Sequence, residues 1–216
     1  MSRKPVLKME ALTVSIGNQP ILADVELSIA AGECVALLGE SGSGKSMTAR
    51  AALGLLPPQA RLAGRVEVNG RDVSGASALS RDGAARPAMV MQDTLSALNP
   101  LTSIGYQLER PLRRRGLGRA EARAEARRLL ADVGLPDPEQ IAARSSPELS
   151  GGQRQRVCIA IALACAAPVI IADEPTSALD VVTQAQILQL LKSVTAAPGG
   201  PGLLFITHDL HAVAQM

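Results

Sequence analysis

The sequence is almost without aromatic side chains. Among its 216 residues there is no tryptophan, and Tyr106 and Phe205 are its only tyrosine and phenylalanine. Proteins that hold single-stranded nucleic acid stack bases on aromatic side chains, so this composition excludes a binding platform of that kind. Positive charge is in small excess, because 22 lysines and arginines face 20 aspartates and glutamates for a net charge of +2. No overall basic field therefore indicates nucleic acid as a partner.

Cysteine is also scarce, with only Cys34, Cys158 and Cys165. None of them forms a CxxC pair or a cysteine–histidine cluster, which excludes a disulfide framework and a zinc site of the usual spacing. Such cysteine usage is typical of a protein kept in a reducing compartment.

An apolar run long enough to cross a membrane is missing too. The stretch Val157–Ala172 has 16 residues without a polar or charged side chain, whereas a membrane-spanning helix needs about 20. Pro168 interrupts it, so we expect a buried helix before the proline and a short parallel strand over 169–172. The first 14 residues lack the apolar segment and cleavage site of a signal peptide. We therefore expect a chain that does not itself span the membrane.

Apolar residues in general are plentiful, at 47% of the chain, which excludes intrinsic disorder and fits one sizeable α/β domain. Strand patterns alternate with helix patterns, which predicts a mainly parallel core sheet. Alternation over 6–29 and 65–69, the latter followed by the hairpin signal Asn69-Gly70, predicts an antiparallel β portion near the N-terminus. The polar helical pattern over 101–135 predicts a helical subdomain with a break near Gly116. Further strands are expected at 34–38, 88–91 and 203–207, and further helices at 45–56, 150–166 and 183–194.

A loop between a predicted strand and a predicted helix fits the phosphate-binding pattern GxxxxGK[ST]. Its residues are Gly39, Glu40, Ser41, Gly42, Ser43, Gly44, Lys45 and Ser46. The glycines let backbone N–H groups surround phosphate oxygens, and the helix N-terminus adds its positive end. We expect Lys45 to lie against the β- and γ-phosphates and the Ser46 hydroxyl to ligate Mg²⁺. The motif predicts a P-loop NTPase.

Two adjacent acids, Asp173 and Glu174, end the apolar strand at 169–172. The carboxyl ends of strands are where open α/β sheets bind their ligands. We expect Asp173 to hold Mg²⁺ through water and Glu174 to orient and deprotonate the attacking water. The plain alternative is an acidic turn before Pro175.

The helix predicted at 150–166 opens with the sequence Leu-Ser-Gly-Gly-Gln. Ser150 and Gln153 have the spacing of a capping box, so a well-capped helix is one interpretation. However, Gly151 and Gly152 each cost a helix about 1 kcal/mol relative to alanine, which favours backbone exposed to an anion. This motif, placed between a P-loop and an Asp-Glu strand, resembles the signature of the ATP-binding-cassette (ABC) family. The resemblance covers nearly the whole chain.

The resemblance implies roles for four more positions. Gln92 is similar to the Q-loop glutamine, which senses Mg²⁺ and the attacking water. Asp180 closes Ser-Ala-Leu-Asp, which is similar to the D-loop that crosses to the opposite protomer. His208 resembles the switch histidine at the γ-phosphate. Ile16 stands where relatives place an aromatic side chain that stacks on adenine.

The family fold implies an α/β P-loop NTPase, and we expect one ABC ATPase domain over 1–216. Residues 1–92 and 151–216 would form the catalytic core with its antiparallel β portion, and about 93–150 the helical subdomain. Relatives continue for tens of residues past the switch histidine, so we expect the chain to be truncated at its C-terminal end, Met216.

Within the family, the segments MQDTLSALNP and ADEPTSALDVVTQAQIL resemble the ATPase subunits of peptide and nickel importers, with the nickel-import subunit nearest. This implies ATP and Mg²⁺ as cofactors, and ATP hydrolysis that energises uptake of nickel or of di- and oligopeptides. It also implies integral membrane permease subunits as partners, a second ABC ATPase subunit as dimer partner, and an extracytoplasmic substrate-binding protein as an indirect one. The expected location is peripheral, on the cytoplasmic face of the inner membrane.

Two other functions remain as alternatives. Cassette ATPases that act on nucleic acid carry long insertions or zinc modules between P-loop and signature, and those that act on ribosomes carry two cassettes. Here only 103 residues separate Ser46 from Ser150, and there is one cassette. A degenerate structural subunit would not need Lys45, Asp173, Glu174 and His208, which are all present.

The helical pattern over 101–135 contains seven arginines between residues 113 and 128. Arg119, Arg123 and Arg127 share one helical stripe. We interpret the run as a solvated helix face, with contact to RNA or lipid as the alternative.

Overall fold

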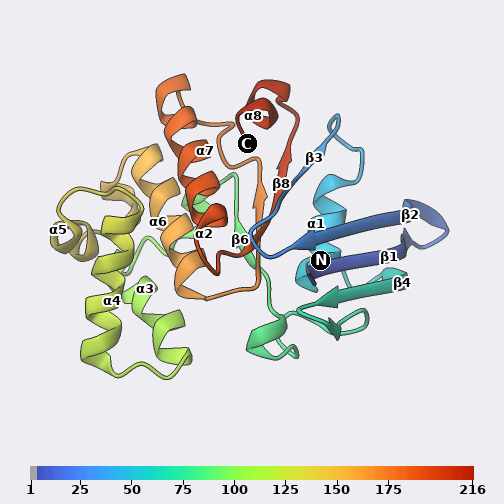
Figure 1. Cartoon of the computed structure of the whole chain (residues 1–216), viewed down its shortest axis with the longest axis horizontal. Helices are drawn as coiled ribbons and strands as arrows, with labels where there is room; N and C mark the ends of the chain where they lie inside the picture. The colour runs from blue at the N-terminus through green and yellow to red at the C-terminus, as the bar shows by residue number, and fades with distance from the viewer. Residues whose placement is uncertain (1–3) are drawn as a thin grey trace. The chain divides into compact units, whose positions relative to one another are not determined.

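The computed structural model describes residues 4–216 and is drawn in Figure 1. The chain forms two compact units. The first comprises residues 4–89, Ala167–Glu174 and Lys192–Met216, and the second comprises Val90–Ala166 and Pro175–Leu191.

An antiparallel sheet forms the N-terminal part of the first unit. Its strands are β1 (Pro5–Ile16), β2 (Gln19–Ala30), β4 (Ala60–Val68) and β5 (Arg71–Asp72), in the order β2-β1-β4-β5. A two-residue turn at 17–18 joins β1 to β2. Asn69 and Gly70 both have positive φ, at 51° and 74°, as a tight hairpin turn requires. The expected antiparallel portion is confirmed.

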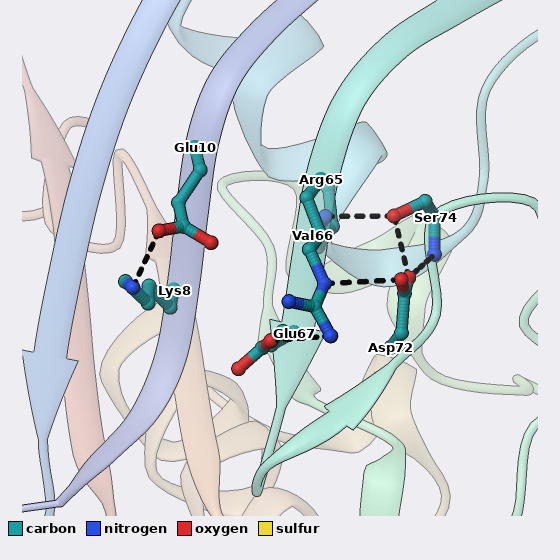
Figure 2. Close-up of polar contacts among 7 residues, drawn as sticks. All are labelled: Lys8, Glu10, Arg65, Val66, Glu67, Asp72 and Ser74. Carbon is teal, nitrogen blue, oxygen red and sulfur yellow. Dashed lines mark hydrogen bonds and ion pairs between the residues drawn. The ribbon is translucent and has the colours of Figure 1, made fainter.

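One face of this sheet carries a row of charged and polar side chains (Figure 2). Arg65 on β4 contacts Glu67 at 2.8 Å and Asp72 at 3.1 Å. Asp72 in turn accepts a hydrogen bond from the Ser74 hydroxyl at 2.6 Å, while that hydroxyl oxygen accepts one from the Val66 N–H at 2.8 Å. The alternate residues are fully buried on the opposite face: Leu7, Met9, Val66 and Val68. A slip of one residue would exchange the two faces, so the period of two fixes the register.

A second sheet contains the four strands expected for the core sheet. They are β3 (Cys34–Leu38), β6 (Ala88–Val90), β7 (Val169–Asp173) and β8 (Gly202–Thr207), in the order β3-β8-β7-β6. β8 runs parallel to both β3 and β7, and every residue of β8 is buried. Helix α1 (Lys45–Leu53) contacts β2, β4 and β7, so the apolar core of this unit lies around it (Figure 1). The unit also contains η1 (Gly83–Ala85) and α8 (Leu210–Gln215).

Helix α1 is shorter than the 45–56 helix that the sequence predicts. It ends at Leu53 because Gly54, at φ 71°, forms a left-handed C-cap. The chain therefore leaves the helix before Pro57, which was the expected stop. A Cβ at Gly54 would come within 2.7 Å of the Ala76 carbonyl oxygen, so the following loop also requires glycine there.

The second unit is helical. Its elements are α2 (Thr94–Ala97), α3 (Ile104–Arg114), α4 (Arg119–Asp132), α5 (Pro138–Ala143), η2 (Ser146–Glu148), α6 (Gly151–Ala164) and the larger part of α7 (Val181–Ala196). The break expected near Gly116 separates α3 from α4. Because α6 packs against α3 and α4, this unit extends past the boundary expected at residue 150. The assignment of 1–216 to a single ATPase domain stays a prediction. No helix within residues 4–216 is long and apolar enough to cross a bilayer.

Two arginines of the run form ion pairs within the helical unit. Arg128 contacts Glu125 at 2.6 Å and Asp132 at 2.8 Å, and Arg127 contacts Glu139 at 3.2 Å. Exposed pairs of this kind contribute little to stability. They are nevertheless what a solvated helix face is expected to show.

Arg81 lies buried against the C-terminal end of α1, with 5% of its surface exposed. Its guanidinium donates hydrogen bonds to four carbonyl oxygens, those of Ala51, Ala52, Val73 and Ala76. Burial lowers the pKa of Arg81. The Arg81 guanidinium thus supplies hydrogen-bond donors to the last carbonyl groups of α1, which have no partner within the helix.

We expect Arg81→Met to lower the free energy of unfolding by about 1–3 kcal/mol, because buried carbonyl groups lose their donors. Chemical denaturation measures this. The exposed Arg86 offers a matched control, since Arg86→Met is expected to change stability by no more than about 0.5 kcal/mol. Equal stability of Arg81→Met and the wild type would contradict the proposal that Arg81 stabilises the C-terminal end of α1.

Candidate functional site

The first unit contains the phosphate-binding loop, which connects β3 to α1. Gly42 and Gly44 have φ of 84° and 93°, values that side chains rarely adopt. A Cβ at Gly44 would lie 2.5 Å from Leu22 Cδ2, and one at Gly39 would lie 2.7 Å from Ser43 Oγ. The backbone of the loop therefore requires glycine at positions 42 and 44.

Lys45 points back into this loop. Its Nζ donates hydrogen bonds to the carbonyl oxygens of Gly39 at 2.7 Å and Glu40 at 2.8 Å. The ammonium group thus lies inside the turn whose N–H groups and helix end attract anions. The expected contact with the β- and γ-phosphates stays a prediction that this position supports.

Ser46 and Asp173, 127 positions apart in the sequence, meet at the end of β7. The Ser46 hydroxyl donates to Asp173 Oδ2 at 3.3 Å. Burial is the main cause that raises the pKa of Asp173, and the hydrogen bond from Ser46 acts in the opposite direction. A cation here would compensate for that burial.

These two oxygen donors fit Mg²⁺. Within residues 4–216 no cluster of three or more His, Cys, Asp or Glu side chains could hold a metal alone. Mg²⁺ commonly takes one or two protein ligands and completes its shell with phosphate oxygens and water. When bound, it would neutralise charge on the phosphates. Ser46 and Asp173 are the residues that would hold it.

Glu174 and His208 form a close pair at the ends of adjacent strands. His208 Nδ1 lies 2.6 Å from Glu174 Oε1. The Glu174 N–H donates to the Ile206 carbonyl oxygen at 2.9 Å, which extends the pairing of β7 with β8 by one residue. Glu174, which directly follows β7, has φ of 49°, an uncommon left-handed conformation for a residue other than glycine. The arrangement supports the predicted use of this carboxylate as a base.

Ile16 ends β1, opposite Gln19 of β2. Leu22, three residues further along β2, is the side chain that crowds Gly44 of the phosphate-binding loop. The β1–β2 turn therefore belongs to the same part of the first unit as the loop. The contact of Ile16 with a base stays a prediction.

The remaining predicted site residues belong to the second unit. Ser150 caps α6: its Oγ accepts from the Gln153 N–H at 3.3 Å, and Gln153 Oε1 accepts from the Ser150 N–H at 2.9 Å. The capping-box interpretation is thus confirmed. It leaves the first-turn N–H groups of Gly151 and Gly152 outside the box, so an anion role remains compatible with it.

Gln92 and Gly151 line one cavity of about 310 Å³ in this unit. Arg154 and the buried Gln155 line it as well, and Asp93 caps α2 at its edge. The structure thus groups Gln92 with the signature helix. The predicted contact of Gln92 with Mg²⁺ is untested.

Sequence reasoning missed two features of the site. The left-handed backbone of Glu174 had no signal, because glutamate carries no preference for it. The second feature is the pair of hydrogen bonds from Thr183 to Asp180. A sequence signal for it did exist, because Asp180 and Thr183 have the spacing of an N-cap and its third helical residue. The first feature lies at a predicted site residue, and the second lies three positions after one.

Comparison with known proteins agrees with this geometry. The family described as ABC transporter matches residues 22–177. The chain is 43% identical to the "Probable D,D-dipeptide transport ATP-binding protein DdpD" of Escherichia coli, covering 99% of this chain and 67% of that protein. It is 41% identical to the oligopeptide transport ATP-binding protein OppD of Mycobacterium tuberculosis, over 98% of this chain and 36% of that one.

Among solved structures, the dimeric ATP-binding cassette MJ0796 in a post-hydrolysis state, bound to ADP and Pi, superposes with a TM-score of 0.80. The sequences are 30% identical, and the match covers 97% of this chain and 90% of that one. The expected α/β P-loop fold is confirmed.

We expect Glu174→Gln to retain ATP binding and to lower the turnover rate by about 10²–10⁴, because the amide cannot take a proton from water. Phosphate release gives the rate, and equilibrium titration with ATP gives the affinity. Gln184→Glu, a change of the same size on α7, is the control for altered charge. Near-normal hydrolysis by Glu174→Gln would assign the base to another residue.

We expect the wild type to bind GTP within about tenfold of ATP, a gap of about 1.4 kcal/mol, because Ile16 offers a base only apolar contact. Ile16→Tyr is expected to tighten ATP binding, since stacking contributes about 1–3 kcal/mol per base. Titration of both nucleotides into both proteins measures this, with Ile16→Leu as control. Strong preference of the wild type for ATP would show that another residue holds the base.

Proposed function

Because the chain belongs to the ABC transporter family, we propose that the importer it energises takes up short peptides. As an ABC ATPase it binds ATP and Mg²⁺, and it is the ATP-hydrolysing subunit of an importer. Such ATPase subunits work together with membrane permease subunits, and this keeps them associated with the membrane. They also form dimers.

The cargo is supported by what the relatives are named for. DdpD carries the name of D,D-dipeptide transport and OppD that of oligopeptide transport, and both match nearly the whole chain at more than 40% identity. Nickel, which the sequence resemblance favoured, has no such support among these matches and stays an alternative.

We further propose that each ATP site is completed by two chains. The P-loop, Asp173, Glu174 and His208 belong to the first unit, whereas Ser150–Gln153 belong to the second. The free N–H groups at the start of α6 would face the phosphates held by the partner's loop. The partner is a second ABC ATPase, of the same or of a different sequence.

The finer assembly follows from an importer role. An extracytoplasmic substrate-binding protein would deliver the peptide to the permease. The ATPase would lie peripherally on the cytoplasmic face of the inner membrane, where ATP is available.

Uptake by the source organism tests the cargo. We expect deletion of this chain to abolish uptake of labelled di- and tripeptides while ⁶³Ni²⁺ uptake continues. The wild-type chain restores peptide uptake, and Lys45→Ala does not, because the phosphates lose their cation. Lys192→Ala is the matched control, because Lys192 donates to the Gln215 carbonyl oxygen and is not part of the phosphate-binding loop. Loss of nickel uptake alone would establish the nickel alternative, and loss of neither would refute the cargo proposal.

A further inference from the structure

Gly152 of the signature segment faces α7 at very close range. A Cβ at this position would lie 2.6 Å from Thr183 Cγ2, closer than packed carbon atoms approach. By contrast, a Cβ at Gly151 would meet Leu179 Cδ2 at 3.6 Å, an ordinary contact. The two adjacent glycines therefore differ: packing leaves room for a side chain at Gly151 and none at Gly152.

The second branch of the Thr183 side chain binds Asp180. Thr183 Oγ1 donates to Asp180 Oδ2 at 2.7 Å, and the Thr183 N–H donates to Asp180 Oδ1 at 3.0 Å. The bond from the Thr183 hydroxyl is also the main cause that lowers the pKa of Asp180. Thr183 is half-buried, and its methyl and hydroxyl groups thus contact two different segments.

We propose that Thr183 is a positioning residue that holds the start of the signature helix and the Asp180 turn in one fixed arrangement. Its methyl group packs against Gly152, and its hydroxyl group donates a hydrogen bond to Asp180. Gly152 is glycine because the Thr183 methyl group occupies the place of a side chain. This inference rests on the proposed role of Ser150–Gln153 and Asp180 in ATP hydrolysis.

Two substitutions separate the two branches of Thr183. Thr183→Val keeps the methyl group beside Gly152 and replaces the hydroxyl, so it removes only the side-chain hydrogen bond to Asp180. Thr183→Ser keeps the hydroxyl and removes the methyl, so it opens the space beside Gly152 alone. Thr195→Val removes a hydroxyl from the same helix, at a residue with 5% exposure, and is the control for loss of a threonine hydroxyl elsewhere in α7.

The decisive measurement is a double-substitution cycle on Gly152 and Thr183, with kcat and KM for ATP and the melting temperature of each variant. We expect Gly152→Ala to lower kcat/KM about tenfold or more, since displacement of the helix start misplaces its contacts. The pair Gly152→Ala with Thr183→Ser is expected to recover to within about threefold of the wild type, because the added Cβ takes the place of the lost methyl. Thr183→Ser alone is expected to lose less than about threefold.

Thr183→Val is expected to lower kcat about fivefold with a smaller change in KM, because Asp180 loses one anchor while the helix start stays seated. Thr195→Val is expected to change the melting temperature more than kcat. If Thr183→Val acted only by destabilising the protein, the two variants would not differ in whether kcat or the melting temperature changes more.

Three outcomes would overturn the inference. Gly152→Ala could be fully active, or Thr183→Ser could fail to restore the activity that Gly152→Ala loses. Thr183→Ser could also restore a loss of activity in Gly151→Ala equally well, which would show that the effect is not specific to Gly152. Lys45→Ala reports separately on the proposed function. If Lys45→Ala hydrolyses ATP like the wild type, the proposed ATP site fails, whatever the Gly152 and Thr183 variants show.

Discussion

The contact of Ser46 with Asp173 depends on the order of strands in the parallel sheet, and the rest of the nucleotide site depends on the same order. The phosphate-binding loop follows β3, the two acids end β7, and β8 lies between these strands. Because all three strands run in one direction, their carboxyl ends present Ser46, Asp173, Glu174 and His208 at one edge. The central strand β8 is buried throughout, so the spacing of this edge is set by the core of the unit.

The sequence predicts the parts of this site that arise from local pattern. A continuous apolar run bounded by glycine or acid predicts a parallel core strand, and β3, β7 and β8 appear where those runs occur. Strands β7 and β8 are almost entirely buried, whereas β3 is partly exposed. Gly42 and Gly44 of the P-loop likewise have positive φ. These features are predictable because each follows from residues close together in the chain.

Features that depend on distant neighbours were not predictable in the same way. Helix α1 ends early because Gly54 meets the 76–81 loop, and a proline three residues later suggested a longer helix. Helix α6 joins the helical unit because of its packing against α3 and α4, although its sequence motif suggested the catalytic core. The sequence likewise does not show that Gly152 lies against Thr183, because the two residues are 31 positions apart.

The left-handed backbone at Glu174 has a consequence for how this protein can change. A glutamate in that conformation carries about 1–3 kcal/mol of local strain, which glycine or asparagine would relieve. Selection for stability alone would therefore drive a carboxylate out of the place where the proposed chemistry needs it. A library of variants sorted only for thermal resistance should therefore accumulate substitutions of Glu174 that relieve the strain and lose the proposed catalytic carboxylate.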